Sequence, residues 1–322
     1  MIKVAVTDYS FDTLDVETAV LEPLGCAIVA RRRGSTSAEL ADLVADADHV
    51  ITQFAPVNAT VIGAMRKVRV IVRYGVGVDN VDLEAARAQG IPVCNVPDYC
   101  IDEVADQTLA LLLATTRGVV PNCQAVRAGQ WKLAVPLPAM RTLAEMTVGV
   151  VGFGRLGRAV VRRLLAFGGR VLVYDPVVPA HVIADAGGVP TDLRSLLAES
   201  DAVTLHCPST PQTRRLMNRE TIGQMRRGAI LVNVSRGDVV DSAALVEALA
   251  NGHLSAAALD VFDPEPIPAD CPLLRMDNVV LSAHVASASA KAARKLRETV
   301  AGTVARAIRG EPLVNIVNGV RV

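Results

Sequence analysis

The chain has 322 residues, of which 51% are hydrophobic and 3% aromatic, and 33 basic side chains balance 33 acidic ones. This composition argues against a disordered chain. It also disfavours a nucleic-acid-binding protein, which usually carries a basic surface. The length suits two domains of about 150 residues each. No apolar run reaches about 18 residues, so we expect no membrane span.

The six cysteines are scattered and form no CxxC pair, and no histidine lies at metal-ligand spacing from them. We therefore expect reduced thiols and no metal site. The sequence opens directly with the strand-like run 2–6, without the pattern of a signal peptide. These features indicate a cytoplasmic protein that does not associate with membranes.

Short runs rich in Val and Ile alternate with stretches of helical period in the first third of the chain. We expect strands over 2–6, 26–30, 48–52 and 69–73, and helices over 37–47 and 82–90. Strands separated by stretches of helix length imply parallel βαβ units and a doubly wound sheet.

A second series of the same kind follows. Its expected strands cover 147–152, 170–175, 201–206, 229–234, 255–261 and 278–283. Long helices are expected over 101–118 and over 286–310, where the second ends at a glycine as helices often do. The segment 120–140 contains prolines and the one tryptophan, and we expect it to be irregular.

This order predicts an α/β protein with two doubly wound parallel sheets. We expect one discontinuous domain from residues 1–100 and 287–322, with the tail 311–322 packing back on it. The second domain then covers residues 101–286. Two chain crossings between domains suit hinged closure on a ligand.

The second series opens with a G-x-G-x-x-G motif at Gly152, Gly154 and Gly157, after a Val-rich run and before a helical stretch. The first glycine permits a tight turn, the second lets a pyrophosphate approach the backbone, and the third lets the helix pack on the strand. The alternative is a glycine-rich turn in an ordinary βαβ unit.

Asp175 ends the next expected strand, 18 residues after Gly157. A carboxylate at this position accepts hydrogen bonds from the adenosine ribose hydroxyls and repels a 2′-phosphate. The sequence therefore predicts NAD (NADH) as the cofactor and disfavours NADP.

Ligands of such sheets bind beyond the carboxyl ends of the strands. Few polar residues follow the expected strands of the second series, namely His206, Cys207, Ser235, Arg236, Asp260, Glu265 and His284.

Three of these residues form a coherent set for hydride transfer to a carbonyl. The guanidinium of Arg236 suits a substrate carboxylate, and His284 is suited to exchange a proton near neutral pH. Glu265, if close, would favour the protonated imidazole. Taken singly, Arg236 could be a surface ion pair, His284 a structural hydrogen-bonding residue and Glu265 a solvated acid.

Several stretches resemble the D-isomer-specific 2-hydroxyacid dehydrogenases, nearest to the branch of the C-terminal-binding proteins and phosphoglycerate dehydrogenases. They are 75–97, 152–157, 206–213, 224–241 and 258–266, together with His284. The resemblance implies a Rossmann-type cofactor domain inserted into a flavodoxin-like substrate domain, and a homodimer through the NAD-binding domain.

The resemblance also implies roles for individual residues. The catalytic residues would be Arg236, Glu265 and His284, and the substrate would be bound by Arg236 and the backbone of Val76 and Gly77. The residues expected at NAD are Gly152, Gly154, Arg155, Leu156, Gly157, Asp175, His206, Cys207, Pro208, Thr213, Val234, Ser235, Arg236, Asp260 and His284.

The predicted function is D-stereospecific hydride transfer between nicotinamide and C2 of a small 2-hydroxy or 2-keto acid. One alternative is a corepressor-like protein that senses NAD(H). Another is a phosphoglycerate- or phosphite-type dehydrogenase on the same scaffold. Phosphoglycerate is disfavoured because the stretch 52–60 has no arginine to hold a phosphate. We also expect no appended serine-sensing domain, since the sequence ends at residue 322.

Overall fold

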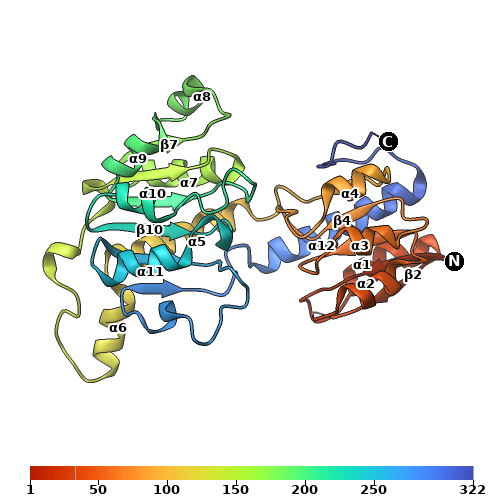
Figure 1. Ribbon diagram of the computed structural model, residues 1–322, viewed down its shortest axis with the longest axis horizontal. Helices are drawn as coiled ribbons and strands as arrows, with labels where there is room; N and C mark the ends of the chain where they lie inside the picture. The colour runs from red at the N-terminus through yellow and green to blue at the C-terminus, as the bar shows by residue number, and fades with distance from the viewer. Residues whose placement is uncertain (33, 322) are drawn as a thin grey trace. The chain divides into compact units, whose positions relative to one another are not determined.

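The computed structural model describes residues 1–32 and 34–321 of the chain. The chain divides into two compact units, Met1–Tyr99 with Ser289–Val322, and Cys100–Ala288. Each unit contains a sheet of parallel strands with helices on both faces (Figure 1). The predicted α/β class with two parallel sheets is therefore confirmed.

The sheet of the first unit has the order β2-β1-β3-β4-β5. Its strands are β1 (Ile2–Val6), β2 (Cys26–Ala30), β3 (His49–Thr52), β4 (Ile71–Arg73) and β5 (Val93–Cys94). This is the flavodoxin-like doubly wound order. The four strands expected here all form. The sequence did not predict β5, because two residues are too few to show a period.

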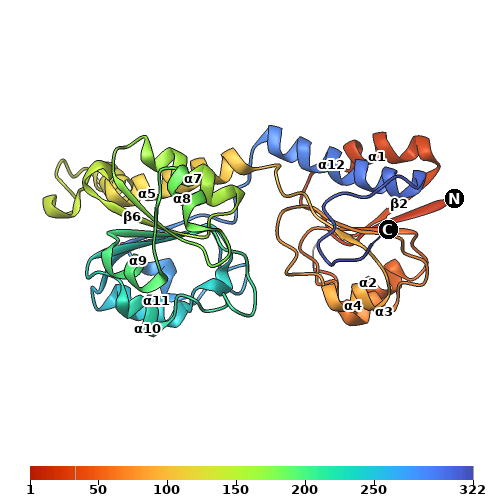
Figure 2. The same cartoon turned by 90° about the horizontal axis from the view of Figure 1, so that it is seen from above.

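Helices cover both faces of this sheet, α1 (Asp15–Leu21) and α12 (Ala290–Arg309) on one face and α2 (Ser37–Val44), α3 (Ala59–Gly63) and α4 (Leu83–Ala88) on the other (Figure 2). Alternate residues of β1 serve the two cores. Val4 and Val6 pack in the core beneath α1 and α12, and Ala5 packs in the opposite core.

The helix α12 starts later than the expected 286–310. The hydroxyl of Ser289 accepts a hydrogen bond from Ala292 N and so fixes the first turn. The helix ends before Gly310, which adopts the left-handed conformation, as the sequence predicts. The segment that follows returns to the sheet, where the Asn318 side chain bonds Val93 N at 3.1 Å and Ile91 O at 2.8 Å. The tail thus packs on the first unit as expected.

The sheet of the second unit has the order β12-β11-β10-β9-β6-β7-β8, which is the Rossmann order with one added strand. Its strands are β6 (Thr147–Val151), β7 (Arg170–Tyr174), β8 (Val189–Pro190), β9 (Ala202–Leu205), β10 (Ala229–Asn233), β11 (Leu254–Leu259) and β12 (Val279–Leu281). The six predicted strands form, and the two-residue β8 was not predicted. The order reverses between β6 and β9, which is where such sheets bind ligands.

The helices of this unit also form two layers. One face carries α5 (Ile101–Thr116) and α7 (Arg155–Leu165), and the other carries α9 (Leu193–Glu199), α10 (Arg219–Gln224) and α11 (Ser242–Ala250) (Figure 2). A short helix α8 (Ala180–Asp185) precedes β8. Short 3₁₀ turns lie at Glu22–Leu24 in the first unit and at Leu137–Ala139, Leu143–Glu145, Gly237–Val239 and Pro272–Arg275 in the second.

The sequence predicted that the segment 120–140 is irregular, and this prediction is wrong for its first part. It begins with a helix, α6 (Val119–Arg127). Pro121 fits this helix because it lies in the first turn, where the backbone N–H has no partner within the helix. Over the described part of the chain, no helix is both long and apolar enough to cross a membrane.

Candidate active site

The glycine motif forms the turn between β6 and α7. Gly152 has a φ of +98°, and a side chain there would lie 2.8 Å from the backbone of His206 and Cys207. A Cβ on Gly157 would lie 2.0 Å from Gly152 O, so the helix packs directly on the turn. Gly154 has open space around it. The turn therefore leaves backbone exposed at the start of α7, where helix N–H groups attract phosphate.

Asp175 directly follows β7 and links two loops. Its Oδ2 accepts a hydrogen bond from Phe153 N at 2.7 Å, and its Oδ1 accepts from Val177 N and Val178 N at 2.8 and 3.0 Å. Burial alone would raise the pKa of Asp175, but these backbone donors hold it below its ordinary value. The carboxylate is thus ionised and also fixes the glycine turn.

The residues after β9 lie beneath this turn. The Nε2 of His206 is hydrogen-bonded to the Thr204 hydroxyl at 2.9 Å, and its Nδ1 is buried without a partner in residues 1–32 and 34–321. Burial lowers the pKa of His206 to about 3 and raises the pKa of Cys207 to about 11. Both side chains are therefore neutral at physiological pH and provide no charged group for catalysis.

Two further stretches expected at the cofactor are locally well defined. Arg155 and Leu156 form the first turn of α7, with Arg155 exposed. In the loop after β9, the Thr213 hydroxyl donates to Pro208 O at 2.6 Å and accepts from Thr210 N at 2.8 Å. These bonds close the loop on itself, so its backbone is held in one conformation.

The loop after β10 carries Arg236 and is fixed by Asn233, a buried residue that the sequence did not single out. Asn233 Oδ1 accepts from the N and the hydroxyl of Ser235 at 3.0 and 2.9 Å, and its Nδ2 donates to Arg236 O at 2.8 Å. Arg236 also donates to Ser235 O at 2.7 Å. Val234 is buried. A polar residue in the otherwise apolar run 229–234 was the available signal.

Gly237 brings the loops after β10 and β11 into contact. A Cβ on Gly237 would lie 1.9 Å from the carbonyl carbon of Phe262 and 2.0 Å from its oxygen. No side chain fits at this position without moving one of the two backbones. Arg236 and Glu265 lie on these two loops, so the approach at Gly237 sets their spacing. No pattern in the sequence distinguishes Gly237 from the other glycines.

Glu265 and His284 are hydrogen-bonded to each other, with 2.8 Å between Glu265 Oε2 and His284 Nδ1. The other carboxylate oxygen accepts from Phe262 N at 2.9 Å. Burial alone would raise the pKa of Glu265, but His284, Phe262 N and the charge of Arg236 hold it below its ordinary value. The structure thus brings an ionised carboxylate, an imidazole and a nearby guanidinium together at the carboxyl edge of the sheet.

Asp260, which directly follows β11, builds the turn that presents His284. Its carboxylate is fully buried and accepts from the Ser282 hydroxyl, Val285 N and Ala286 N at 2.5, 3.0 and 2.8 Å. Its backbone oxygen accepts from His284 N at 2.7 Å. The role visible in this structure is to hold the turn in place.

The sequence predicted that His284 ends its strand, and this prediction is wrong. The strand β12 ends at Leu281, and His284 lies in the following turn with a φ of +52°. This left-handed conformation is uncommon for residues other than glycine, and it persists because the surrounding bonds enforce it.

The loop after β4, in the first unit, presents backbone donors. Gly75 O accepts from Val96 N at 3.0 Å, and Val76 O accepts from Asn95 Nδ2 at 2.6 Å. In the part of the chain that the structure describes, the N–H groups of Val76 and Gly77 have no acceptor. Consecutive free N–H groups form a concavity that suits an anion such as a carboxylate.

Residues 109–286 match the family model of the NAD binding domain of D-isomer specific 2-hydroxyacid dehydrogenases. The second unit is therefore an NAD-binding unit, and the protein is an NAD-dependent oxidoreductase. Similar proteins narrow this class, since a glyoxylate reductase from Korarchaeum cryptofilum is 42% identical over 279 residues, which are 85% of this chain and 84% of that one. The chain belongs to the D-isomer specific 2-hydroxyacid dehydrogenase family.

Two other similar proteins show the range of names within the family. A D-3-phosphoglycerate dehydrogenase from Methanocaldococcus jannaschii is 39% identical over 321 residues, which are 99% of this chain and 60% of that one. The chain thus spans less than two thirds of that relative. The crystal structure of a D-lactate dehydrogenase from Aquifex aeolicus with NAD and lactic acid has a TM-score of 0.86 at 29% identity, over 96% of each chain.

Proposed function

We propose that the protein transfers a hydride between NADH and C2 of a small 2-keto acid, giving the D-2-hydroxy acid, and catalyses the reverse reaction. The observation that carries this proposal is the Glu265–His284 pair at 2.8 Å, on the same sheet edge as the glycine turn. An imidazole held by an ionised carboxylate is suited to exchange a proton near neutral pH.

The proposed mechanism assigns His284 the proton and Glu265 the charge that supports it. Bound NADH supplies the hydride to C2. His284, bonded to Glu265 through Nδ1, gives the proton on Nε2 to the carbonyl oxygen, which becomes the hydroxyl. In oxidation the same nitrogen removes that proton. Glu265 remains ionised throughout, because its pKa lies below the ordinary value.

The proposed substrate contacts hold the carboxylate of the acid. Arg236 offers a planar pair of N–H donors for a carboxylate. The free N–H groups of Val76 and Gly77 offer two more. On this proposal, the domain formed by residues 1–100 and 287–322 binds the substrate and the domain 101–286 binds the cofactor.

The proposed cofactor contacts follow the loops described above. The pyrophosphate would lie on the turn of Gly152, Gly154 and Gly157 with Arg155 and Leu156, and the adenosine ribose would be bound by Asp175. The remaining contacts would come from His206, Cys207, Pro208, Thr213, Val234, Ser235, Arg236, Asp260 and His284.

We propose that NADPH is a poor cofactor, because the ionised Asp175 repels a 2′-phosphate. Initial rates with NADH and NADPH at equal concentration test this directly. A rate with NADPH equal to that with NADH would contradict it.

The proposed substrate class is a small, unbranched 2-keto acid such as glyoxylate, in line with the name of the Korarchaeum relative. A phosphorylated hydroxy acid is the second candidate. It is favoured by the names of several relatives and by Arg73. The guanidinium of Arg73, at the end of β4, lies 5.6 Å from the ring of Phe54 in the loop that lacks an arginine of its own.

NADH oxidation with a panel of keto acids tests the function. The panel contains glyoxylate, pyruvate, hydroxypyruvate, phenylpyruvate, branched 2-keto acids and phosphohydroxypyruvate. We expect the highest kcat/KM with glyoxylate or hydroxypyruvate. Preference for the phosphorylated acid would support the second candidate, and no turnover with any member would refute the proposed function.

We also propose that the protein is a cytoplasmic homodimer formed through the NAD-binding domain. A set of apolar side chains in the second unit is exposed, namely Val119, Val126, Trp131, Leu133 and Leu137. Trp131 is 92% exposed, which favours a surface covered by a second copy. Sedimentation should show a dimer that the substitution Trp131→Ser weakens, and a monomeric wild type would contradict this.

A further inference from the structure

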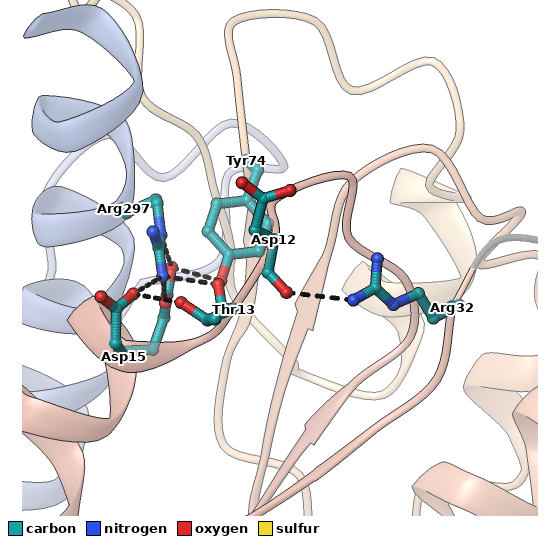
Figure 3. Close-up of polar contacts among 7 residues, drawn as sticks. Asp12, Thr13, Asp15, Arg32, Tyr74 and Arg297 are labelled. Atoms are coloured by element: carbon teal, nitrogen blue, oxygen red, sulfur yellow. Dashed lines mark hydrogen bonds and ion pairs between the residues drawn. The ribbon is translucent and has the colours of Figure 1, made fainter. Parts of the chain in front are cut away.

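A buried ion pair in the first unit connects helices that are far apart in the sequence. Glu17, on α1, has no solvent exposure. Its Oε1 accepts from Arg297 Nε at 3.0 Å, and its Oε2 accepts from Arg297 Nη2 at 2.7 Å. Arg297 lies on α12, 280 residues further along the chain. Figure 3 shows this guanidinium beside the hydroxyl of Tyr74.

The guanidinium of Arg297 is held from several directions. It also donates to Thr13 O at 2.8 Å and to Asp15 Oδ1 at 2.7 Å (Figure 3). It lies 4.9 Å from the centroid of the Phe11 ring. The Thr13 hydroxyl and Arg297 lower the pKa of Asp15 to about 2. Arg297 is thus fixed in one orientation, and Glu17 keeps a charged partner in the core.

Such a pair contributes little to stability, since the cost of removing two charges from water offsets most of their attraction. The main effect of the pair is therefore on the position of the residues that it contacts. The hydroxyl of Tyr74 donates to Glu17 Oε1 at 2.9 Å. The ring of Tyr74 is almost fully buried and packs edge-on against Phe11, with 5.4 Å between ring centroids.

Tyr74 directly precedes the loop with the free N–H groups. Its backbone N donates to Thr52 O at 2.8 Å, and its side chain is held by Glu17. The next two carbonyls are held by Val96 N and the Asn95 side chain. A further bond joins Gly75 N to Arg73 O at 2.9 Å. Among the described residues, the N–H groups of Val76 and Gly77 have no acceptor, so they remain available to a ligand.

The same helix also holds the chain where it leaves the first unit. Lys295 Nζ donates to the carbonyl of Asp98 at 2.8 Å and to its carboxylate at 3.1 Å. Asp98 lies next to the end of the N-terminal part of the unit at Tyr99, and α12 begins just after the return at Ser289. The first two turns of α12 thus anchor the loop after β4, through Arg297 and Glu17, and also the chain where it leaves the unit.

We propose that Glu17, Tyr74 and Arg297 form a positioning cluster that orients the N–H groups of Val76 and Gly77 toward the substrate carboxylate. The three are positioning residues, because none touches the reacting atoms. The proposal rests on the proposed function, in which these N–H groups bind the acid.

The substitution Tyr74→Phe tests the cluster with the loss of one oxygen. It leaves the Glu17–Arg297 pair and the ring packing in place. We expect KM for the 2-keto acid to rise about tenfold, as for the loss of one hydrogen bond to a charged group. The turnover number and KM for NADH should stay within about twofold of the wild type, since the cluster acts on the loop after β4 alone.

Glu298→Gln is the matched control. It breaks the exposed Arg294–Glu298 pair, 2.8 Å long, on the same helix, without touching Tyr74. All kinetic constants should stay at the wild-type values. A similar rise of KM in the control would show that any change on α12 disturbs the loop, and would overturn the specific role of the cluster.

A double variant separates charge burial from positioning. Glu17→Met with Arg297→Met removes both charges together, which proteins tolerate better than the loss of one partner. KM for the keto acid should rise as in Tyr74→Phe, because Tyr74 loses its acceptor. Adding Tyr74→Phe to this variant should raise KM no further, and an additive rise would overturn the proposed connection.

Amide hydrogen exchange at Val96 tests the role of the cluster without an activity assay. This N–H reports the bond to Gly75 O. It should exchange about tenfold faster in Tyr74→Phe while the amides of β1 and β3 are unchanged. Equal exchange in wild type and variant would overturn the proposal even with an active enzyme. If the wild type reduces no keto acid but the Val96 effect is present, the proposed function fails and the anchoring of the loop stands.

Discussion

The pairing of Glu265 with His284 depends on hydrogen bonds to the backbone of neighbouring residues. The carboxylate is oriented by Phe262 N, and His284 is held in its turn by Asp260. Both residues are about one third exposed, at 32% and 28% of the side chain, so a substrate can reach them. Backbone hydrogen bonds thus fix the pair while both side chains remain partly exposed, as acid–base catalysis requires.

Replacing Glu265 by Gln should change the pH dependence of reduction more than its maximal rate. The amide keeps a hydrogen-bond acceptor for Nδ1 but loses the charge that favours the imidazolium. Because Glu265 is ionised in the wild type and Gln carries no charge, kcat/KM for reduction should begin to fall at a lower pH in the variant. Measured pH profiles check this, and superimposable profiles would show that the carboxylate charge has no part in catalysis.

Gly237→Ala tests the contact between the loops after β10 and β11. The added methyl would lie within 2.0 Å of the Phe262 backbone, so the loops must separate and carry Arg236 away from Glu265. We expect kcat/KM to fall by about 10²-fold, as for a misplacement near the reacting groups. The control Gly223→Ala has open space around its Cβ and should retain wild-type kinetics.

At this scale the sequence could predict the residues that we propose for catalysis, because Arg236, Glu265 and His284 follow strands that end at one edge. It did not single out Asn233, whose side-chain bonds lie within the loop after β10. It could not predict Gly237, whose importance lies in a contact between two loops. The sequence also could not predict the cluster of Glu17, Tyr74 and Arg297, since no local pattern connects residues 280 positions apart.

At the scale of elements, the strand pattern was readable wherever an apolar run was long enough. The missed strands β5 and β8 have two residues each and show no period. The sequence does not predict the helix α6, because Pro121 is typical of a break, although a proline in the first turn costs no hydrogen bond. The parallel, doubly wound arrangement followed from the βαβ alternation, whereas the strand order is known from the structure.

The packing of α7 on β6 gives a prediction for the cofactor. Gly157→Ala would place a methyl 2.0 Å from Gly152 O, so the helix must withdraw from the turn. We expect the Kd for NADH to rise at least about tenfold, because the helix N-terminus no longer faces the pyrophosphate correctly. Fluorescence titration measures this. Gly302→Ala in α12, where nothing lies within 4 Å, should leave NADH binding unchanged.

At the scale of the whole molecule, each unit contains a histidine that remains neutral. Burial lowers the pKa of His49, in the first unit, to about 4 and that of His206, in the second, to about 3. Both folded values lie below the ordinary value of about 6.5, so the unfolded chain binds protons first as the pH falls. The stabilisation is complete above about pH 6.5 and is lost progressively toward pH 4.

Both units should therefore be less stable in mild acid. At about pH 5 each histidine should lower the free energy of unfolding by about 2 kcal/mol relative to pH 7. Urea unfolding followed by amide exchange in each unit measures this. His49→Gln should reduce the loss in the first unit and leave it unchanged in the second. Equal stability at the two pH values would contradict the burial of neutral imidazoles.

In the proposed mechanism, His284 gives the proton in reduction of a 2-keto acid. The most direct test is single-turnover NADH oxidation by His284→Ala beside the wild type, with the best substrate of the panel. We expect the rate to fall by about 10²- to 10⁴-fold, the range for loss of general acid catalysis, with an unchanged Kd for NADH. A variant that turned over near the wild-type rate would contradict it.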